Sequence, residues 1–304
     1  MEIIVDRSNT AVQGAAAQTN TQFTRKIMQL KIIGESINDS VPSTHKLFEA
    51  EDIAALKELA KTQEESGAAF IDVNVGPRTP DFMKMLVGEV HQVTTVPISV
   101  DTPDPALAEA GLKACDPARG KPILNSISPL RLEMFALYKM VPFRPILLIS
   151  EHKGGACHTA EETFEAAKFL LAEARKLGIP NDDCIFDPGI APIGTDSEGN
   201  VKRLLTTLAM IQNDPSFKGV HASVGLSNFT VMLPPKRADG SPTKGPLESA
   251  FLTKAIPLGL DHVIGSVKRK YELLSADHPA MQCLEDCLTR GGFESIMRVR
   301  EFYK

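Results

Sequence analysis

Short apolar runs alternate with longer amphipathic stretches along most of this chain of 304 residues. The runs are four to eight residues long and rich in Val, Ile, Leu and Phe, which is typical of strands buried on both faces of a parallel sheet. The pattern therefore predicts eight strands. They lie within residues 30–35, 68–75, 96–101, 121–127, 144–150, 184–189, 220–226 and 261–267.

The stretches between these runs have the periodicity of helices. Residues 159–178 are the clearest case, because Thr159 and Glu162 have the spacing of an N-terminal capping box and Gly178 ends the pattern. Strands that alternate with helices predict right-handed crossovers and a parallel sheet. With eight such units we expect an α/β fold, a single (β/α)8 TIM barrel. An open doubly wound sheet is the alternative, but no glycine-rich phosphate loop follows the first strand.

The position of the first strand sets the domain boundaries. We expect the barrel to span residues 28–304 as one domain. Residues 1–27 are expected to form a short N-terminal extension packed on the barrel, in which the apolar residues 2–5 can add a small strand.

Composition excludes several classes of function. The net charge is -5 and there is no basic block, so neither nucleic acid nor an anionic membrane is an expected partner. No run of about 18 apolar residues and no signal peptide are visible, which favours a cytoplasmic protein. The five cysteines are odd in number and irregularly spaced, as is typical of a reduced protein.

Two cysteine-containing segments raise the question of a metal site. Cys283 and Cys287 are one helical turn apart without a second pair of ligands nearby, and His152, Cys157 and His158 lie in one loop. Because zinc sites need a close set of four ligands, we expect the protein to hold no metal of its own.

Polar side chains stand at the end of almost every predicted strand. On the barrel interpretation, the carboxyl ends of all strands meet at one mouth, so these residues would converge on one site. A single Asp or Asn at a strand end is usually a turn former, but a whole series of them needs partners or a ligand. The series comprises Glu35, Asn38, Asp72, Asn74, Asp101, Asn125, Ser126, Asp187, Gly225, Ser227 and Asn228.

The chemistry of this series points to a heterocyclic ligand. Carboxylates accept hydrogen bonds and amides both donate and accept, whereas a site with almost no Lys or Arg does not suit a phosphate. A pterin fits, because its ring NH and exocyclic amino group form a two-donor edge that one carboxylate can match. Paired carboxylates also serve glycosidases, but this chain has no Trp and only three Tyr for sugar stacking.

Six segments occur in an order and spacing that resemble the pterin-binding TIM-barrel family. They are IIGESIN, FIDVNVGP, ISVDT, ILNS, IFDPG and GLSN, and the resemblance covers about residues 28–270. Within the family the chain looks like the methyltetrahydrofolate:corrinoid methyltransferases. The other main branch, dihydropteroate synthase, carries Ser-Arg-Lys at strand seven and Arg-His at strand eight, where this chain reads GLSN and VIGSV. In the synthases these cations stabilise a pyrophosphate leaving group, and this chain lacks them, so the methyltransferase branch is favoured.

The resemblance implies roles for individual residues. Asp187 would grip the amino edge of the pterin, Asp101 and Asn125 would hold the other side of the ring, and the catalytic Asn228 would lie near nitrogen 5. Gly225 and Ser227 would belong to the same pterin pocket. Four further residues match family residues that line the mouth, and the resemblance assigns them no definite role. These four are Glu35, Asn38, Asp72 and Asn74. Ser36, in place of an expected Arg, and the long loop of residues 233–246 depart from the family pattern.

The implied reaction moves a methyl group between nitrogen 5 of tetrahydrofolate and the cobalt of a corrinoid (cobalamin), with the direction left open. The chain lacks a DxHxxG-type cobalamin motif, so the corrinoid is expected on a separate protein that docks over the barrel mouth. A homodimer is also expected. A dihydropteroate synthase-like enzyme and a non-catalytic folate-binding protein remain the alternatives.

Overall fold

The structure is a computed structural model that describes residues 30–152 and 154–304. The predicted extension, residues 1–27, and its short strand lie outside the described residues. Eight parallel strands form one sheet with the order β10-β1-β2-β3-β4-β5-β8-β9. All eight coincide with predicted strands. They are β1 (Lys31–Asn38), β2 (Phe70–Asn74), β3 (Ile98–Asp101), β4 (Ile123–Ile127), β5 (Arg144–Leu148), β8 (Ile185–Asp187), β9 (His221–Ala222) and β10 (His262–Gly265).

Hydrogen bonds between the first and last members of this order close the sheet into a barrel. The amide of Asp261 donates to the carbonyl of Ala222 at 3.3 Å, and the amide of Ile264 donates to the carbonyl of Val224 at 2.9 Å. The predicted (β/α)8 barrel is therefore confirmed, and the alternative of an open doubly wound sheet is wrong.

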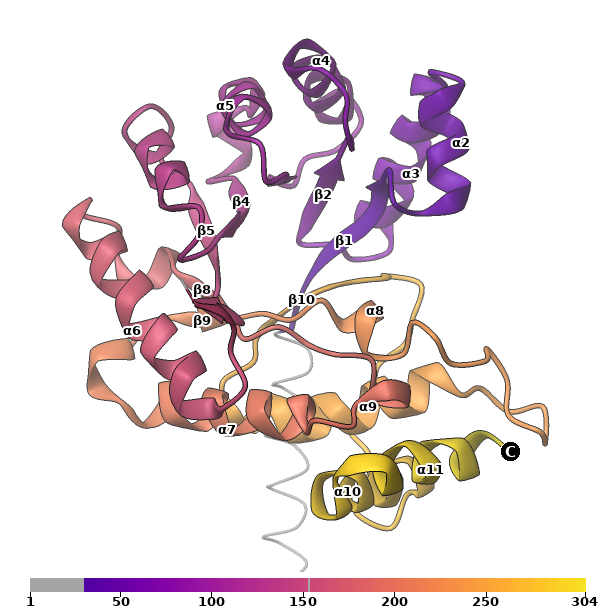
Figure 1. Cartoon of the computed structure of the whole chain (residues 1–304). Helices are drawn as coiled ribbons and strands as arrows, with labels where there is room; N and C mark the ends of the chain where they lie inside the picture. The colour runs from indigo at the N-terminus through magenta and orange to yellow at the C-terminus, as the bar shows by residue number, and fades with distance from the viewer. Residues whose placement is uncertain (1–29, 153) are drawn as a thin grey trace, which may run out of the picture.

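Helices surround the strands on the outside of the barrel (Figure 1). The capping box at Thr159 and Glu162 is present at the start of α6, as predicted. Between β4 and β5 the crossover is a stretch of 3-10 helix, Leu132–Lys139, rather than an α-helix. The α-helices are α2 (Pro42–Glu49), α3 (Ile53–Glu65), α4 (Pro80–His91), α5 (Pro105–Ala114), α6 (Ala160–Lys176), α7 (Asn200–Asn213), α8 (Leu226–Phe229), α9 (Lys244–Ala255), α10 (Pro279–Arg290) and α11 (Gly292–Tyr303).

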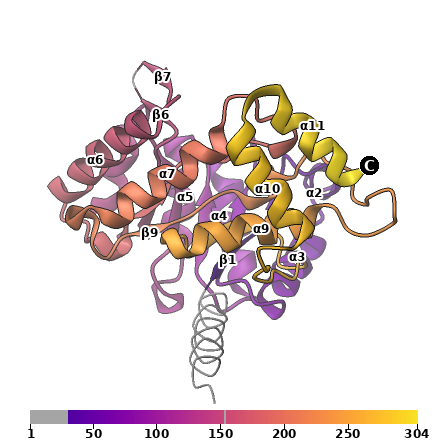
Figure 2. The same cartoon turned by 90° about the horizontal axis from the view of Figure 1, so that it is seen from below.

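The last two helices follow β10 and pack against each other as a hairpin. In Figure 2, α10 and α11 lie beside α9, and α10 packs directly on it. None of the helices in the described part of the chain has the length and apolar character that crossing a bilayer requires.

The interior of the barrel has an apolar floor. Five strands contribute one inward side chain each to a buried cluster, and each of these side chains is at most 5% exposed. Because side chains alternate along a strand, the residue two positions later on the same strand also points inward. This alternation places the polar strand-end residues directly above the floor. The floor consists of Ile33, Phe70, Ile123, Ile146 and Ile185.

Candidate functional site

The register of β2, β3 and β4 brings acidic and amide side chains into contact at the mouth. Asp72 is opposite Ser99, and Asp101 is opposite Asn125. The hydroxyl of Ser99 donates to Asp72 Oδ1 at 2.6 Å, and Asn74 Nδ2 donates to Asp101 Oδ2 at 3.0 Å. The predicted convergence of these strand ends is thus present in the structure.

Asp72 and Asp101 both have raised pKa values and are therefore harder to ionise than surface carboxylates. Burial raises the pKa of Asp72 well above its usual value, and the negative charge of Asp101 raises it further. Burial also raises the pKa of Asp101, although the hydrogen bond from Asn74 and the charge of Arg131 oppose this. The pKa of Asp72 is raised more strongly than that of Asp101, so Asp72 is the member of this pair that is harder to ionise.

Asp187 stands at the end of β8, where the IFDPG segment turns out of the barrel. It is 6% exposed, and burial raises its pKa to about 6. The amide of Gly189 donates to its Oδ1 at 2.8 Å, and the hydroxyl of Ser223 donates to its Oδ2 at 3.3 Å. Gly189 has a φ of +68°, which glycine adopts most easily, so the Pro-Gly sequence allows the chain to fold back onto the carboxylate. A buried carboxylate that accepts from two donors in the described part of the chain retains the capacity to accept more.

The segment after β9 connects the last predicted motif, GLSN, to β1. The hydroxyl of Ser227 donates to Glu35 Oε2 at 2.8 Å, and burial raises the pKa of Glu35. Asn228 is exposed on the four-residue helix α8. Its side chain makes no hydrogen bond within the described residues, and a methyl group on Gly225 would lie 2.8 Å from its Nδ2. The amide group is therefore free to meet a ligand.

Asn38 forms a hydrogen bond within its own turn rather than with other predicted site residues. Its Oδ1 accepts a hydrogen bond from the amide of Ser40 at 2.8 Å, which fixes the turn after β1. Asn74 contacts both its own turn and the site, because its Oδ1 accepts from the amide of Gly76 at 2.9 Å while its Nδ2 donates to Asp101. The turn-forming interpretation of a strand-end Asn is thus correct for Asn38.

The sequence reasoning missed cations at this mouth. Arg131 Nη2 lies 3.4 Å from Ser126 Oγ, and its charge lowers the pKa of Asp101. Arg269 Nη1 lies 3.0 Å from Glu248 Oε1. The prediction of a site with almost no Lys or Arg is therefore wrong at its rim. Neither arginine follows a strand directly, so the strand-end pattern had no signal for them.

Glu248 is a further acidic residue that the strand-end pattern did not indicate. It belongs to α9 and is fully buried, and burial raises its pKa to about 7. The hydroxyl of Thr230 donates to its Oε1 at 2.5 Å. Ser99 and Ser223 could have been found, because each lies two residues before a predicted site residue on the same inward face.

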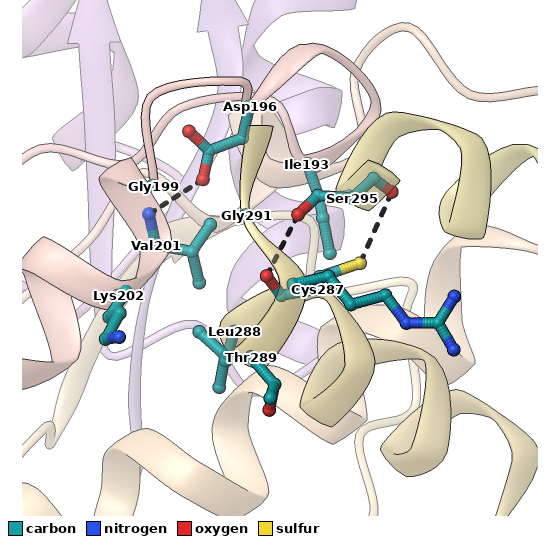
Figure 3. A pocket seen from close by; sticks show the side chains of 11 residues that line it. Ile193, Asp196, Gly199, Val201, Lys202, Cys287, Leu288, Thr289, Gly291 and Ser295 are labelled. Atoms are coloured by element: carbon teal, nitrogen blue, oxygen red, sulfur yellow. Dashed lines mark hydrogen bonds between the residues drawn. The ribbon is translucent and has the colours of Figure 1, made fainter. Parts of the chain in front are cut away.

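A separate cavity of about 200 Å³ lies between the segment after β8 and the α10–α11 hairpin (Figure 3). Its buried carboxylate, Asp196, accepts hydrogen bonds from the amides of Asn200 at 2.8 Å and Val201 at 2.9 Å, which caps α7. Cys287 Sγ lies 3.5 Å from the carbonyl of Ser295. These contacts fix helices, and the strand-end acids do not line this cavity.

The expectation that the protein holds no metal stays a prediction. Cys157 is buried with its Sγ directed at the carbonyl of Ile149, and His152 accepts from the amide of Gly154. Among the described residues, one group has ligand atoms close enough for a metal ion, namely His221, Asp261 and His262. It lies where β9 and β10 begin, at the opposite end of the barrel from the mouth.

Comparisons with known proteins agree with this architecture. Residues 37–265 match the family described as pterin binding enzyme. The chain is 26% identical over 243 residues to the methylcorrinoid:tetrahydrofolate methyltransferase of Eubacterium limosum, an alignment covering 77% of this chain and 83% of that protein. A solved structure of Yersinia pestis DHPS with a pterine-sulfa conjugate superposes with a TM-score of 0.53 at 15% identity. It covers 79% of this chain and 89% of that one, and at this identity it supports the fold alone.

Proposed function

The chain belongs to the family of pterin-binding enzymes, and from this membership we propose that it is a methyltransferase acting between tetrahydrofolate and a corrinoid. The methyl group moves between nitrogen 5 of the folate and the cobalt of the corrinoid. The observation that carries the proposal is the buried, under-used carboxylate of Asp187 at a mouth that also offers a free amide on Asn228. The similarity to a methylcorrinoid:tetrahydrofolate methyltransferase supports the choice of reaction.

In this proposal the mouth binds the pterin by its polar edges. The ionised Asp187 accepts hydrogen bonds from the two-donor edge of the ring, and charge-assisted bonds of this kind are about twice as strong as neutral ones. Asp101 and Asn125 contact the other side of the ring, and Asn74 holds Asp101 in place through its hydrogen bond of 3.0 Å. Ser227 keeps Glu35 oriented at the rim.

Asn228 is proposed to assist the departure of the folate nitrogen. The methyl group transfers in an in-line displacement, and the nitrogen becomes a stronger hydrogen-bond acceptor as its bond to carbon breaks. The neutral amide donates a hydrogen bond to this nitrogen that is stronger in the transition state than in the bound substrate. Such a bond lowers the activation free energy of methyl transfer. The same transition state serves both directions of transfer.

The corrinoid is proposed to arrive on a separate protein that covers the mouth. A dihydropteroate synthase-like activity has less support, because the two rim arginines lie near acidic partners rather than forming a free anion site. A purely folate-binding protein would have no use for the free amide of Asn228. The proposed homodimer and the corrinoid partner both stay predictions.

The decisive experiment is methyl transfer from methyltetrahydrofolate to free Co(I) cobalamin, followed by the change in cobalt absorbance. We expect enzyme-dependent formation of methylcobalamin. Tight folate binding without transfer, either to free cobalamin or to a corrinoid protein, would instead support the non-catalytic alternative.

The affinity for folate is expected to fall in mildly acidic solution. Because the pKa of Asp187 is raised to about 6, the free protein takes up a proton there below that pH and loses the acceptor that the pterin needs. The dissociation constant should rise about tenfold between pH 7 and pH 5. Folding stability should change with pH in the opposite direction to folate affinity. Burial favours the neutral form of Asp187, so its contribution to the stability of the fold is greatest at low pH and is lost as pH rises through 6. Titrations of folate binding at several pH values would test this, and a pH-independent constant would remove Asp187 from the pterin contact.

Gly225→Ala is expected to slow methyl transfer about tenfold with little change in stability. The backbone of Gly225, with φ of −73°, accepts alanine, but the new methyl group would lie 2.8 Å from Asn228 Nδ2 and displace it. Displacing a reacting contact by about 1 Å costs up to ~100-fold in rate, and the flexible amide should avoid part of that loss. Single-turnover rates and melting temperatures would test this. Gly88→Ala, in α4, where the methyl group has open space, is the matched control.

A further inference from the structure

A cationic pocket lies beside the barrel mouth. It has a volume of about 480 Å³, and among the described residues its lining includes Lys244, Lys268, Arg269 and Lys270 and one carboxylate, Glu272. The whole chain has a net charge of -5, so this concentration of positive charge is local. The pocket is built by the long loop that departs from the family pattern and by the segment after β10.

Arg269 connects this pocket to the proposed pterin site. Its guanidinium pairs with Glu248 at 3.0 Å, and its charge also reaches Glu35, whose carboxylate accepts from Ser227. Ser227 precedes Asn228 on α8, so one continuous rim joins the amide at the reacting nitrogen to the cationic pocket. A ligand that extends from one to the other need not cross the barrel.

The lysines of the pocket have capacity left for an anion, although Lys244 Nζ already donates to the carbonyl of Val231 at 3.3 Å. No carboxylate in the described ranges lies within ion-pair distance of Lys244, Lys268 or Lys270. The helix α9 begins at Lys244 without a side-chain cap, so its first amides add further positive potential. The hydroxyl of Thr243, just before this helix, is fully buried and has no hydrogen-bond partner among the residues described.

We propose that this pocket binds the carboxylates of the glutamate tail of the folate substrate, and that it favours tails extended by γ-linked glutamates. This inference rests on the proposed function. Folates carry the pterin at one end and carboxylates at the other, and each added γ-glutamate brings one more negative charge. With the pterin under Asn228, a tail that leaves along the α8 rim reaches four cations. A lysine-rich wall with flexible side chains suits a run of carboxylates, whereas it offers no flat face for a second ring.

The test compares the mono- and tri-γ-glutamate forms of methyltetrahydrofolate in equilibrium titrations. We expect the wild-type protein to bind the triglutamate about tenfold more tightly, which corresponds to two exposed ion pairs. The gain should shrink as salt is raised. In the double variant Lys268→Ala/Lys270→Ala the two folates should bind with nearly equal affinity, and the monoglutamate itself should bind more weakly because its own tail carboxylates face the same pocket. Arg269 is left unchanged because it neutralises the buried Glu248.

The control removes the same charge elsewhere. Lys84 and Lys139 are exposed and do not line the pocket, so Lys84→Ala/Lys139→Ala should keep the full triglutamate gain. Equal affinities for the two folates in the wild-type protein would overturn this inference and leave the proposed function intact. Binding of neither folate would overturn both. If the pocket variant kept the triglutamate gain but lost transfer to a corrinoid protein, the pocket would be a docking surface for that partner, and the tail assignment would be wrong.

Discussion

Replacing Asn228 with alanine is expected to lower the rate of methyl transfer by about 100- to 1,000-fold, the usual loss for one donor that stabilises developing charge. The dissociation constant of methyltetrahydrofolate should change by less than about tenfold, because a ground-state hydrogen bond contributes only about 1 kcal/mol. The rate is more sensitive than the affinity since the methylated nitrogen is a weak acceptor until its bond to carbon breaks.

The structure also separates this effect from a loss of folding. The side chain of Asn228 is exposed, and α8 has Gly225 rather than Asn228 at its N-cap position. Alanine should therefore leave the melting temperature unchanged. Single-turnover rate, folate affinity and melting temperature are measured on the same preparation, with Asn213→Ala, at an exposed helix end, as the control. A normal rate accompanied by a lowered melting temperature would exclude the catalytic role.

Asp187→Asn is expected to weaken folate binding by about 2 kcal/mol, or roughly 30-fold at neutral pH. The substitution exchanges one acceptor oxygen for a donor that faces the donors of the pterin, and it removes a charge-assisted pair. Folding should not suffer. The remaining oxygen can still accept from Gly189, and Ser223 can turn its hydroxyl to accept from the new amide.

This variant has an informative stability readout. Burial raises the pKa of Asp187 to about 6, so at neutral pH the unliganded barrel holds a carboxylate in an unfavourable place. Asn removes that charge, and the variant should be at least as stable as the wild type while binding folate less well. Asp182→Asn, at an exposed position before β8, is the control for loss of one charge. Unchanged folate affinity in Asp187→Asn would show that the carboxylate faces no pterin.

The alternation of residues explains why the fold and much of the site could be predicted from the sequence. Short apolar runs separated by helical periods have few solutions other than a parallel barrel, and the residue at each run's end then has a fixed place at the mouth. Asp72, Asp101 and Asp187 were found in this way. The same periodicity extends back to Ser99 and Ser223, which hydrogen-bond two of these carboxylates.

The rest of the site depends on distances that local patterns do not encode. Glu248 lies within a helix and Arg269 several residues beyond a strand, and their contact exists because the loops after β9 and β10 fold over the same rim. The raised pKa values of Asp72 and Asp101 depend on burial and on the register between neighbouring strands. Asn38 shows the converse, since a strand-end Asn with the expected spacing serves its own turn.

The arrangement of floor and mouth has a consequence for how such a barrel can evolve. Each of several strands supplies one apolar side chain to the floor and, two residues later, one polar side chain to the mouth, as Phe70 and Asp72 do on β2. The two positions are only about 7 Å apart, yet one is selected for packing and the other for ligand chemistry. Mutations at the mouth can therefore change substrate preference without disturbing the packing on which folding depends. A lineage with this architecture can explore new ligands through single substitutions while the stability of its scaffold is inherited unchanged.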